Sequence, residues 1–147
     1  MSEEERICPK DGFPMRHIRG KWRCVAEYLD ERIGGRAITD VVQRDDTVYY
    51  VFENGYELPL LCYCCGKPLV ITAGIASEKR RMIGRRLQAM SVVPVTLEDG
   101  LEATQFSLEF TPKGILGREV KVMTSLDVAA RLQRSQTHKQ HTPRHHK

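Results

Sequence analysis

Two turn dipeptides, Asn54-Gly55 and Asp99-Gly100, constrain the fold of this chain more than any other feature. Each lies between two segments rich in β-branched, aromatic and other apolar residues. A Gly that follows Asn or Asp between two such segments is the strongest short-range signal for a β-hairpin. The sequence therefore predicts two antiparallel hairpins, each with one of these dipeptides at its turn.

The loop length fixes which residues of a hairpin face each other. Two-residue loops pair Val51 with Leu58 and Val93 with Phe106. Because opposed residues share a face, the first hairpin is apolar on both faces and the second on one. We expect the first to be covered on both sides and the second to belong to an antiparallel sheet with one wet face. Pro59 has no amide hydrogen, so its strand should lie at a sheet edge.

Other elements are expected around the hairpins. Apolar residues at helical spacing predict helices over 25–33 and 77–90, and a capping box at Thr124 predicts a helix over 124–134. Further strands are expected over 36–44, 69–72 and 119–123. The predicted fold class is α+β: a mainly antiparallel sheet built from two β-hairpins, with two or three helices and an N-terminal lobe. We expect a single domain over 1–134, with the lobe at 7–35 and the sheet and helices at 36–134, followed by a disordered, basic, His-rich tail at 135–147.

Composition limits the classes of protein that the chain can belong to. It has 147 residues, 41% of them hydrophobic and 29% charged, which is ordinary for a globular protein. No apolar run approaches the roughly 20 residues of a membrane helix. The acidic, polar start is unlike a signal peptide, which favours the cytoplasm. In that compartment the five cysteines are expected to be metal ligands or free thiols rather than disulfides.

The net charge of +4 does not by itself point to nucleic acid, because Lys139, Arg144 and Lys147 of the tail carry most of it. Only local clusters could form a binding surface. One candidate cluster is the loop that contains Arg16, Arg19, Lys21, Trp22 and Arg23. Another is the pair Arg81 and Arg85, at i and i+4 on the expected helix. These seven residues are the predicted contacts for a nucleic acid or a protein partner.

Three of the five cysteines stand within four residues, at Cys62, Cys64 and Cys65. Cys62-x-x-Cys65-Gly66 is the spacing at which a tight turn aims two thiolates at one metal ion. Cys64 stands outside this Cys-x-x-Cys pair, so we treat it as the spare thiol. A Cys-x-x-Cys pair supplies half of a tetrahedral zinc site.

Residues 8–27 contain two further candidate ligands. The segments Cys8-Pro9-Lys10-Asp11-Gly12 and Trp22-Arg23-Cys24-Val25-Ala26-Glu27 resemble the two knuckles of a zinc ribbon. In that family each knuckle is a Cys-x-x-Cys turn, whereas Asp11 and Glu27 stand here where the second cysteines belong. The resemblance implies a ribbon-like lobe that binds Zn²⁺, but this lobe lacks four cysteines of its own.

Three arrangements are compatible with these residues. In the arrangement that we favour, Cys8, Cys24, Cys62 and Cys65 bind one Zn²⁺ and fasten the lobe to the sheet. In the second, Cys8, Asp11, Cys24 and Glu27 bind a metal without the other cysteines, although carboxylates beside thiolates are less typical of structural zinc. In the third, the cysteines pack without a metal. His17 is an alternative ligand.

The predicted function is a zinc-stabilised, non-catalytic binding module whose partner is a nucleic acid or a protein. No phosphate-binding loop, dinucleotide fingerprint, HExxH motif or nucleophile elbow occurs, and no small-molecule substrate or membrane is indicated. The alternatives are an unmetallated interaction domain and a thiol-redox protein that uses Cys62-x-x-Cys65. The redox alternative is disfavoured because no helix is expected to begin before about Ser77, whereas reactive dithiols lie at helix N-termini.

Overall fold

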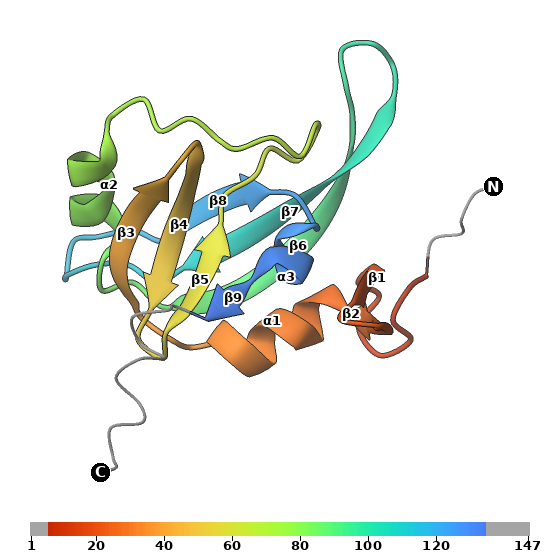
Figure 1. Ribbon diagram of the computed structural model, residues 1–147, viewed down its shortest axis with the longest axis horizontal. Coiled ribbons are helices and arrows are strands. Elements are labelled where there is room, and N and C mark those ends of the chain that lie inside the picture. Colours follow the sequence, from red (N-terminus) through yellow and green to blue (C-terminus); the bar gives the residue numbers. More distant parts are fainter. Residues whose placement is uncertain (1–5, 135–147) are drawn as a thin grey trace.

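The computed structural model describes residues 6–134, and the predicted tail at 135–147 lies outside them. The described residues form three helices and nine strands (Figure 1). In chain order these are β1 (Met15–Ile18), β2 (Lys21–Cys24), α1 (Val25–Ile33), β3 (Ile38–Arg44), β4 (Thr47–Phe52), β5 (Tyr56–Pro59), α2 (Ile75–Met82), β6 (Leu87–Thr96), β7 (Glu102–Phe110), β8 (Val120–Thr124), α3 (Val128–Arg131) and β9 (Gln133–Arg134).

The strands form three antiparallel sheets. The largest has the order β3-β4-β5-β9, a second has the order β6-β7-β8, and β1 and β2 pair by themselves. Figure 1 shows the β1–β2 hairpin at the end of α1, away from the two larger sheets. The predicted α+β class with antiparallel sheets is confirmed.

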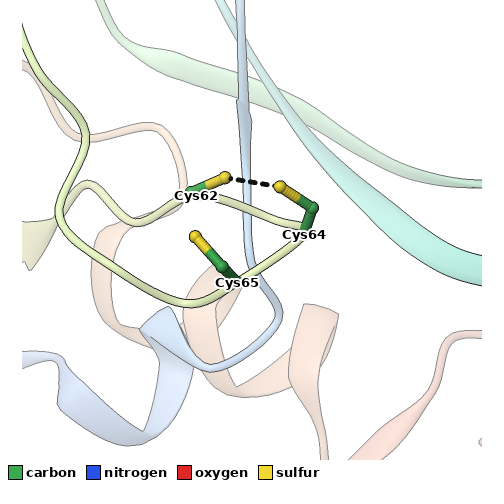
Figure 2. A group of neighbouring side chains, drawn as sticks. All are labelled: Cys62, Cys64 and Cys65. Carbon is green, nitrogen blue, oxygen red and sulfur yellow. Dashed lines mark hydrogen bonds between the residues drawn. The ribbon is translucent and has the colours of Figure 1, made fainter. Parts of the chain in front are cut away.

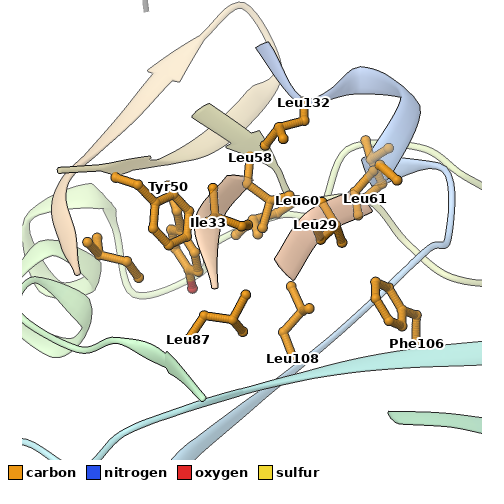
Figure 3. Close-up of a cluster of buried hydrophobic side chains, with 14 of the residues drawn as sticks. Leu29, Ile33, Tyr50, Leu58, Leu60, Leu61, Leu87, Phe106, Leu108 and Leu132 are labelled. Carbon is orange, nitrogen blue, oxygen red and sulfur yellow. The ribbon is translucent and has the colours of Figure 1, made fainter. Parts of the chain in front are cut away.

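One continuous hydrophobic core joins the two larger sheets and α1. Figure 3 shows Leu58 and Leu60 on one side, Phe106 and Leu108 on the other, and Leu29 of α1 among them. All five side chains are almost fully buried. The core draws on residues from Ile18 to Leu132, so the lobe, the sheets and α3 share one interior.

The register of the first hairpin differs by one residue from the prediction. Val51 faces Glu57, and Tyr50 faces Leu58. The reason is the loop, which contains three residues rather than two: the Gly55 amide donates to the Phe52 carbonyl (2.8 Å), and Gly55 has a φ of 91°. A turn followed by a left-handed Gly is the usual three-residue hairpin loop. The prediction that the strand of Pro59 is an edge strand is wrong, because β5 lies between β4 and β9. The short β9 pairs with Tyr56 and Glu57 and stops before Pro59, so the missing amide hydrogen of Pro59 interrupts no pairing with β9.

The second hairpin shows the same shift for the same reason. Val93 faces Gln105, and Val92 faces Phe106. The Gly100 amide donates to the Leu97 carbonyl (2.9 Å) and Gly100 has a φ of 87°, so this loop also holds three residues. Phe106 is fully buried, whereas Val93 is exposed. The predicted apolar face was therefore wrong on the Val93 strand.

The predicted helix over 77–90 is wrong beyond Met82. The helix α2 ends there, and Gly84 has a φ of 98°, which turns the chain out of the helix. Leu87 then begins β6, whose ladder with β7 replaces the expected helical face. Ile83 is half-buried and Leu87 is buried, as an apolar face requires. The prediction failed because it assigned a helical period to residues that continue into a strand.

Two other predicted elements are corrected. Among the described residues no strand forms at 69–72. An isolated bridge between Leu61 and Pro68 lies just before this segment. The helix over 124–134 shrinks to α3, because Thr124 ends β8 and its hydroxyl bonds to Leu61 instead of capping a helix. The predictions at 25–33, 36–44 and 119–123 are confirmed by α1, β3 and β8 within two residues at each end. Among residues 6–134, no helix has the length and apolar character needed to cross a bilayer.

Candidate metal centre

A tight turn at residues 8–13 presents two candidate ligands, Cys8 and Asp11. The Gly12 amide donates to the Cys8 carbonyl (2.9 Å), and the Cys8 amide donates to the Phe13 carbonyl (2.8 Å). The Asp11 carboxylate accepts a hydrogen bond from the Phe13 amide (3.0 Å). The turn requires a φ of 75° at Gly12, which glycine adopts without strain. Cys8 and Asp11 are therefore fixed on one side of this turn.

The other two candidate ligands lie at the start of α1. Cys24 ends β2, where it faces Met15 of β1, and it is also the N-cap residue of α1. Glu27 lies in the first turn of the same helix. The β1–β2 pairing thus carries Cys24 back to the turn at residues 8–13. The positive end of the helix dipole at this point stabilises negatively charged ligands.

These four side chains form one group, which we call the mixed site: Cys8, Asp11, Cys24 and Glu27. One ligand atom from each lies within 4.8 Å of every other. Cys8 and Cys24 are only 5% and 4% exposed, Glu27 is half-buried and Asp11 is exposed. Lys10 forms an ion pair with Glu27 (3.5 Å) at the rim. The group could hold a metal ion through two sulfur and two oxygen atoms.

A shared proton links the two sides of the mixed site. The Cys24 thiol lies 3.3 Å from one Asp11 carboxylate oxygen and donates to it. Burial, together with this hydrogen bond, raises the pKa of Cys24 to about 12, although the backbone amides of Glu27 and Ala26 oppose the rise. Partial desolvation pushes the pKa of Asp11 up, but hydrogen bonds from the Phe13 amide and the Cys24 thiol outweigh it and lower that pKa. A bound cation would take the place of this proton.

The other three cysteines form a separate group, which we call the three-thiol loop: Cys62, Cys64 and Cys65. Figure 2 shows their side chains converging on the inside of the loop. The sulfur atoms all lie within 4.8 Å of one another, and those of Cys62 and Cys64 are 3.0 Å apart. Cys64 and Cys65 are exposed, and Cys62 is half-buried. This group could also hold a metal ion.

The thiols of the loop perturb one another. The hydrogen bond from the Cys64 thiol lowers the pKa of Cys62 to about 7, with help from the Cys64 backbone amide. The same contact raises the pKa of Cys64 to about 11. The contact therefore favours the negative charge on Cys62 and the proton on Cys64.

The structure does not bring Cys8 and Cys24 together with Cys62 and Cys65. Among the described residues the candidate ligands fall into the mixed site and the three-thiol loop, and neither group contains all four predicted cysteines. The physical reason is local: Cys24 is tied to β1, whereas Cys62 follows β5 and is closed into its own turn. Asp11 and Glu27, which stand where a zinc ribbon has cysteines, complete the first group. Cys64, set aside in the sequence as spare, belongs to the second.

Three of the five predicted partner contacts in the lobe line a surface hollow at the mixed site. The hollow has a volume of about 270 Å³, and its walls include Lys21, Trp22, Arg23 and Glu27. Trp22 is 41% exposed and stacks edge-on against His17, with ring centroids 5.7 Å apart. Among the described residues, His17 belongs to neither ligand group. Arg23 lies over the Tyr28 ring (5.6 Å), and its Nε has no hydrogen-bond partner within the described part of the chain.

The four remaining predicted contacts are arginines, and they differ in how far their guanidinium groups are already bonded within the protein. Arg16 bonds to the Met15 carbonyl, and Arg19 bonds to the Tyr28 hydroxyl (3.2 Å). Arg81 forms an ion pair with Glu78 (3.0 Å). Arg85 does not lie on an exposed helix face: it is 8% exposed. Its guanidinium donates to the carbonyls of Arg81, Thr111 and Arg118, each at 2.8 Å. Arg85 thereby joins α2 to the segment that follows β7 and to the segment that precedes β8.

A comparison of the chain with known protein families, with curated proteins and with solved structures finds no match. The chemistry of the site is therefore the basis for any functional assignment.

Proposed function

We propose that this protein is a zinc-stabilised, non-catalytic binding module whose ion is held at the mixed site. The observation that carries the proposal is the position of four ligand atoms, from the turn at 8–13 and from α1, within 4.8 Å of one another. Zinc accepts both thiolate and carboxylate ligands, and four protein ligands make the closed coordination of a structural site. A catalytic zinc would instead keep a position open for water or substrate.

The need for an ion at the mixed site follows from how small the apolar cluster directly around it is, since the rest of the lobe packs into the main core. Among residues 6–134, the buried cluster around the site consists of Cys8, Cys24 and Ala26, with Phe13, Met15 and Met90 half-buried against them. A hydrophobic cluster of this size contributes little to stability. Without an ion, two side-chain contacts hold the turn at 8–13 to the start of α1: the hydrogen bond between Cys24 and Asp11 and the ion pair between Lys10 and Glu27. One backbone hydrogen bond, from the Val25 amide to the Pro14 carbonyl (3.2 Å), adds to them. An ion bound by all four ligands would fix the turn at 8–13 to the start of α1.

The partner surface in this proposal is the hollow beside the ion. Lys21 and Arg23 supply positive charge. The exposed Trp22 ring has the Arg6 guanidinium over it (4.3 Å), and a base or an aromatic side chain can stack on the ring where Arg6 does not cover it. Glu27 and Glu31 line the same hollow, so its charge is mixed rather than uniformly basic. A protein partner suits mixed charge better than a phosphate backbone does, because like charges repel.

A thiol-redox function is the second candidate, and one specific observation favours it. The Cys62 and Cys64 sulfur atoms lie 3.0 Å apart, and the pKa of Cys62 is lowered to about 7 by the Cys64 thiol. A thiolate present near neutral pH is the nucleophile of thiol–disulfide exchange. Against it, the next helix after the loop, α2, begins only at Ile75, so within residues 6–134 the cysteines of the loop do not lie at a helix N-terminus.

Zinc content, measured by native mass spectrometry on paired variants, tests the proposal. We expect one zinc per chain at the mixed site, retained in Cys62→Ser/Cys65→Ser and lost in Cys8→Ser/Cys24→Ser. Removal of zinc by a chelator should lower the Tm on the order of 10 °C, because a ligand at 1,000 times its Kd contributes about 4 kcal/mol. Asp11→Asn and Glu27→Gln should each weaken zinc binding while keeping the size of the side chain.

The matched control is Glu31→Gln, one turn further along α1, where Glu31 contacts Arg32 rather than the mixed site. It should retain zinc and Tm. If the zinc is lost equally from both double-cysteine variants, the four-thiolate site is correct and the mixed site is not. If the metal-free chain melts at the temperature of the untreated one, the ion is not structural.

A further inference from the structure

The three-thiol loop shares no residue with the mixed site, and the function proposed for the mixed site does not use its cysteines. It places three cysteines in four residues, two of them exposed, with every sulfur within 4.8 Å of the others. Exposed free thiols are a liability that a chain seldom concentrates without use. The convergence of all three side chains on the inside of the loop, seen in Figure 2, is what a single bound ion requires.

The backbone holds the loop in this conformation before any ion binds. The Cys62 amide donates to the Lys67 carbonyl (2.7 Å), and the Gly66 amide donates to the Cys62 carbonyl (2.7 Å). Gly66 has a φ of 74°, which closes the turn. At the base of the loop, the Thr124 hydroxyl of β8 donates to the Leu61 carbonyl (2.8 Å) and accepts from the Leu61 amide (3.2 Å). Because these bonds close the loop and fix its base to β8, little conformational entropy is lost on binding.

We propose that Cys62, Cys64 and Cys65 form a second metal site, an open three-thiolate site for a soft monovalent cation of the Cu(I) type. Thiolate ligands select soft cations. Among the described residues, the group contains no histidine and no carboxylate. A monovalent d¹⁰ ion is satisfied by three sulfur atoms in a plane, whereas structural zinc takes four ligands and would be one short here.

The distances fit three-coordinate binding with small movements. Metal–sulfur bonds of about 2.3 Å in a trigonal plane separate the sulfur atoms by about 4 Å. The sulfur atoms now lie within 4.8 Å of one another, with the closest pair at 3.0 Å, so each needs to move by about 1 Å or less. Rotation about the side-chain bonds of Cys64 and Cys65 supplies such movements, because both residues are exposed.

The exposure of this site sets its behaviour apart from that of the mixed site. Cys64 and Cys65 face solvent, so a thiol of a partner molecule can approach the bound ion. Exchange then proceeds by ligand substitution: the incoming thiolate forms a bond to the ion as one cysteine releases it and takes up a proton. No change in oxidation state is involved.

Anaerobic titration of the zinc-loaded full chain with Cu(I), in competition with a chromogenic Cu(I) chelator, tests the proposal. We expect one Cu(I) per chain bound without release of zinc, and three sulfur neighbours by X-ray absorption. Cys64→Ser and Cys65→Ser should each weaken Cu(I) binding on the order of 100-fold or more. Mutating a residue that only hydrogen-bonds to a metal ligand already lowers metal affinity by about 10- to 100-fold, and the loss of a ligand itself should cost at least as much. Tyr63→Phe, which leaves all three thiols in place, is the matched control and should bind as the unmodified chain does.

Three results would overturn the proposal. One is Cu(I) affinity unchanged in Cys64→Ser and Cys65→Ser. Another is Cu(I) binding only as zinc leaves, which would place the ion at the mixed site. The third is a disulfide between Cys62 and Cys64 in protein isolated without air, which would assign the loop to redox chemistry. Zinc retained in these single variants keeps the outcome separate from the test of the mixed site.

Discussion

The mixed site and the three-thiol loop use the same residue type in opposite environments. The thiols of the mixed site are buried beside carboxylates, and Cys24 keeps its proton with a pKa of about 12. The loop exposes thiols beside other thiols, and Cys62 loses its proton at a pKa of about 7. Burial penalises the thiolate, and a neighbouring thiol that donates a hydrogen bond stabilises it. Burial and the neighbouring side chains, rather than cysteine spacing, therefore decide which thiol stays protonated and which ionises near neutral pH.

The two groups also differ in what positions them. The mixed site is assembled from two segments that the β1–β2 pairing and the hydrogen bond from the Val25 amide to the Pro14 carbonyl bring together. The loop is one continuous segment fixed by its own turn and by Thr124. Loss of local order in the lobe would therefore disperse the ligands of the mixed site, whereas the loop depends on the sheet beneath it.

The largest expected contrast is in alkylation of the metal-free protein at pH 7. About half of Cys62 is thiolate there, against about one part in 10⁵ of Cys24. The weaker nucleophilicity of a low-pKa thiolate offsets part of this, which leaves a ratio of several hundredfold or more. Mass spectrometry after brief treatment with iodoacetamide measures both sites in one sample. Equal rates would show that the two environments do not differ as described.

The next contrast is in the pH dependence of zinc binding at the mixed site. Cys24 must release its proton to bind the ion, and with a pKa of about 12 it is still protonated throughout pH 6–8. Apparent zinc affinity should therefore rise with pH, by about tenfold per pH unit for each proton displaced. Competition with a zinc chelator at pH 6, 7 and 8 measures this slope. A flat profile would mean that Cys24 is not a ligand.

The smallest contrast concerns the anchor of the three-thiol loop. Thr124→Val removes the hydroxyl that bonds to both the amide and the carbonyl of Leu61 at a fully buried position. Leaving those groups unpaired should lower the free energy of unfolding by about 1–3 kcal/mol. Thr124→Ser, which keeps the hydroxyl, should cost less. Denaturant unfolding measures the difference, and zinc bound at the mixed site should be unchanged in both variants.

If Thr124→Val and Thr124→Ser were equally stable, the hydroxyl would not hold the base of the loop. If Thr124→Val also lost zinc, the mixed site would depend on the β8 anchor. The comparison between a site built by the lobe and one built on the sheet would then fail.

Features decided by neighbours along the chain were predictable from the sequence. The helix over 25–33 follows from the spacing of Val25, Leu29 and Ile33, and both hairpins follow from their Gly-containing turns. Cys8, Asp11, Cys24 and Glu27 were recognisable as one possible ligand set, because each half keeps the spacing of a metal-binding turn. Turn chemistry and helical periodicity act over a few residues, so they can be read without the fold.

Features that depend on contacts between distant segments were decided only by the tertiary structure. The extra residue in each hairpin loop shifted both registers, and a shift of one changes every cross-strand pair. Pairing with β7 made a strand of Leu87–Thr96, although Leu87 and Met90 also fit a helical period. The division of five cysteines into two groups likewise required three-dimensional placement, since sequence spacing limits how ligands within a turn converge but not which turns meet.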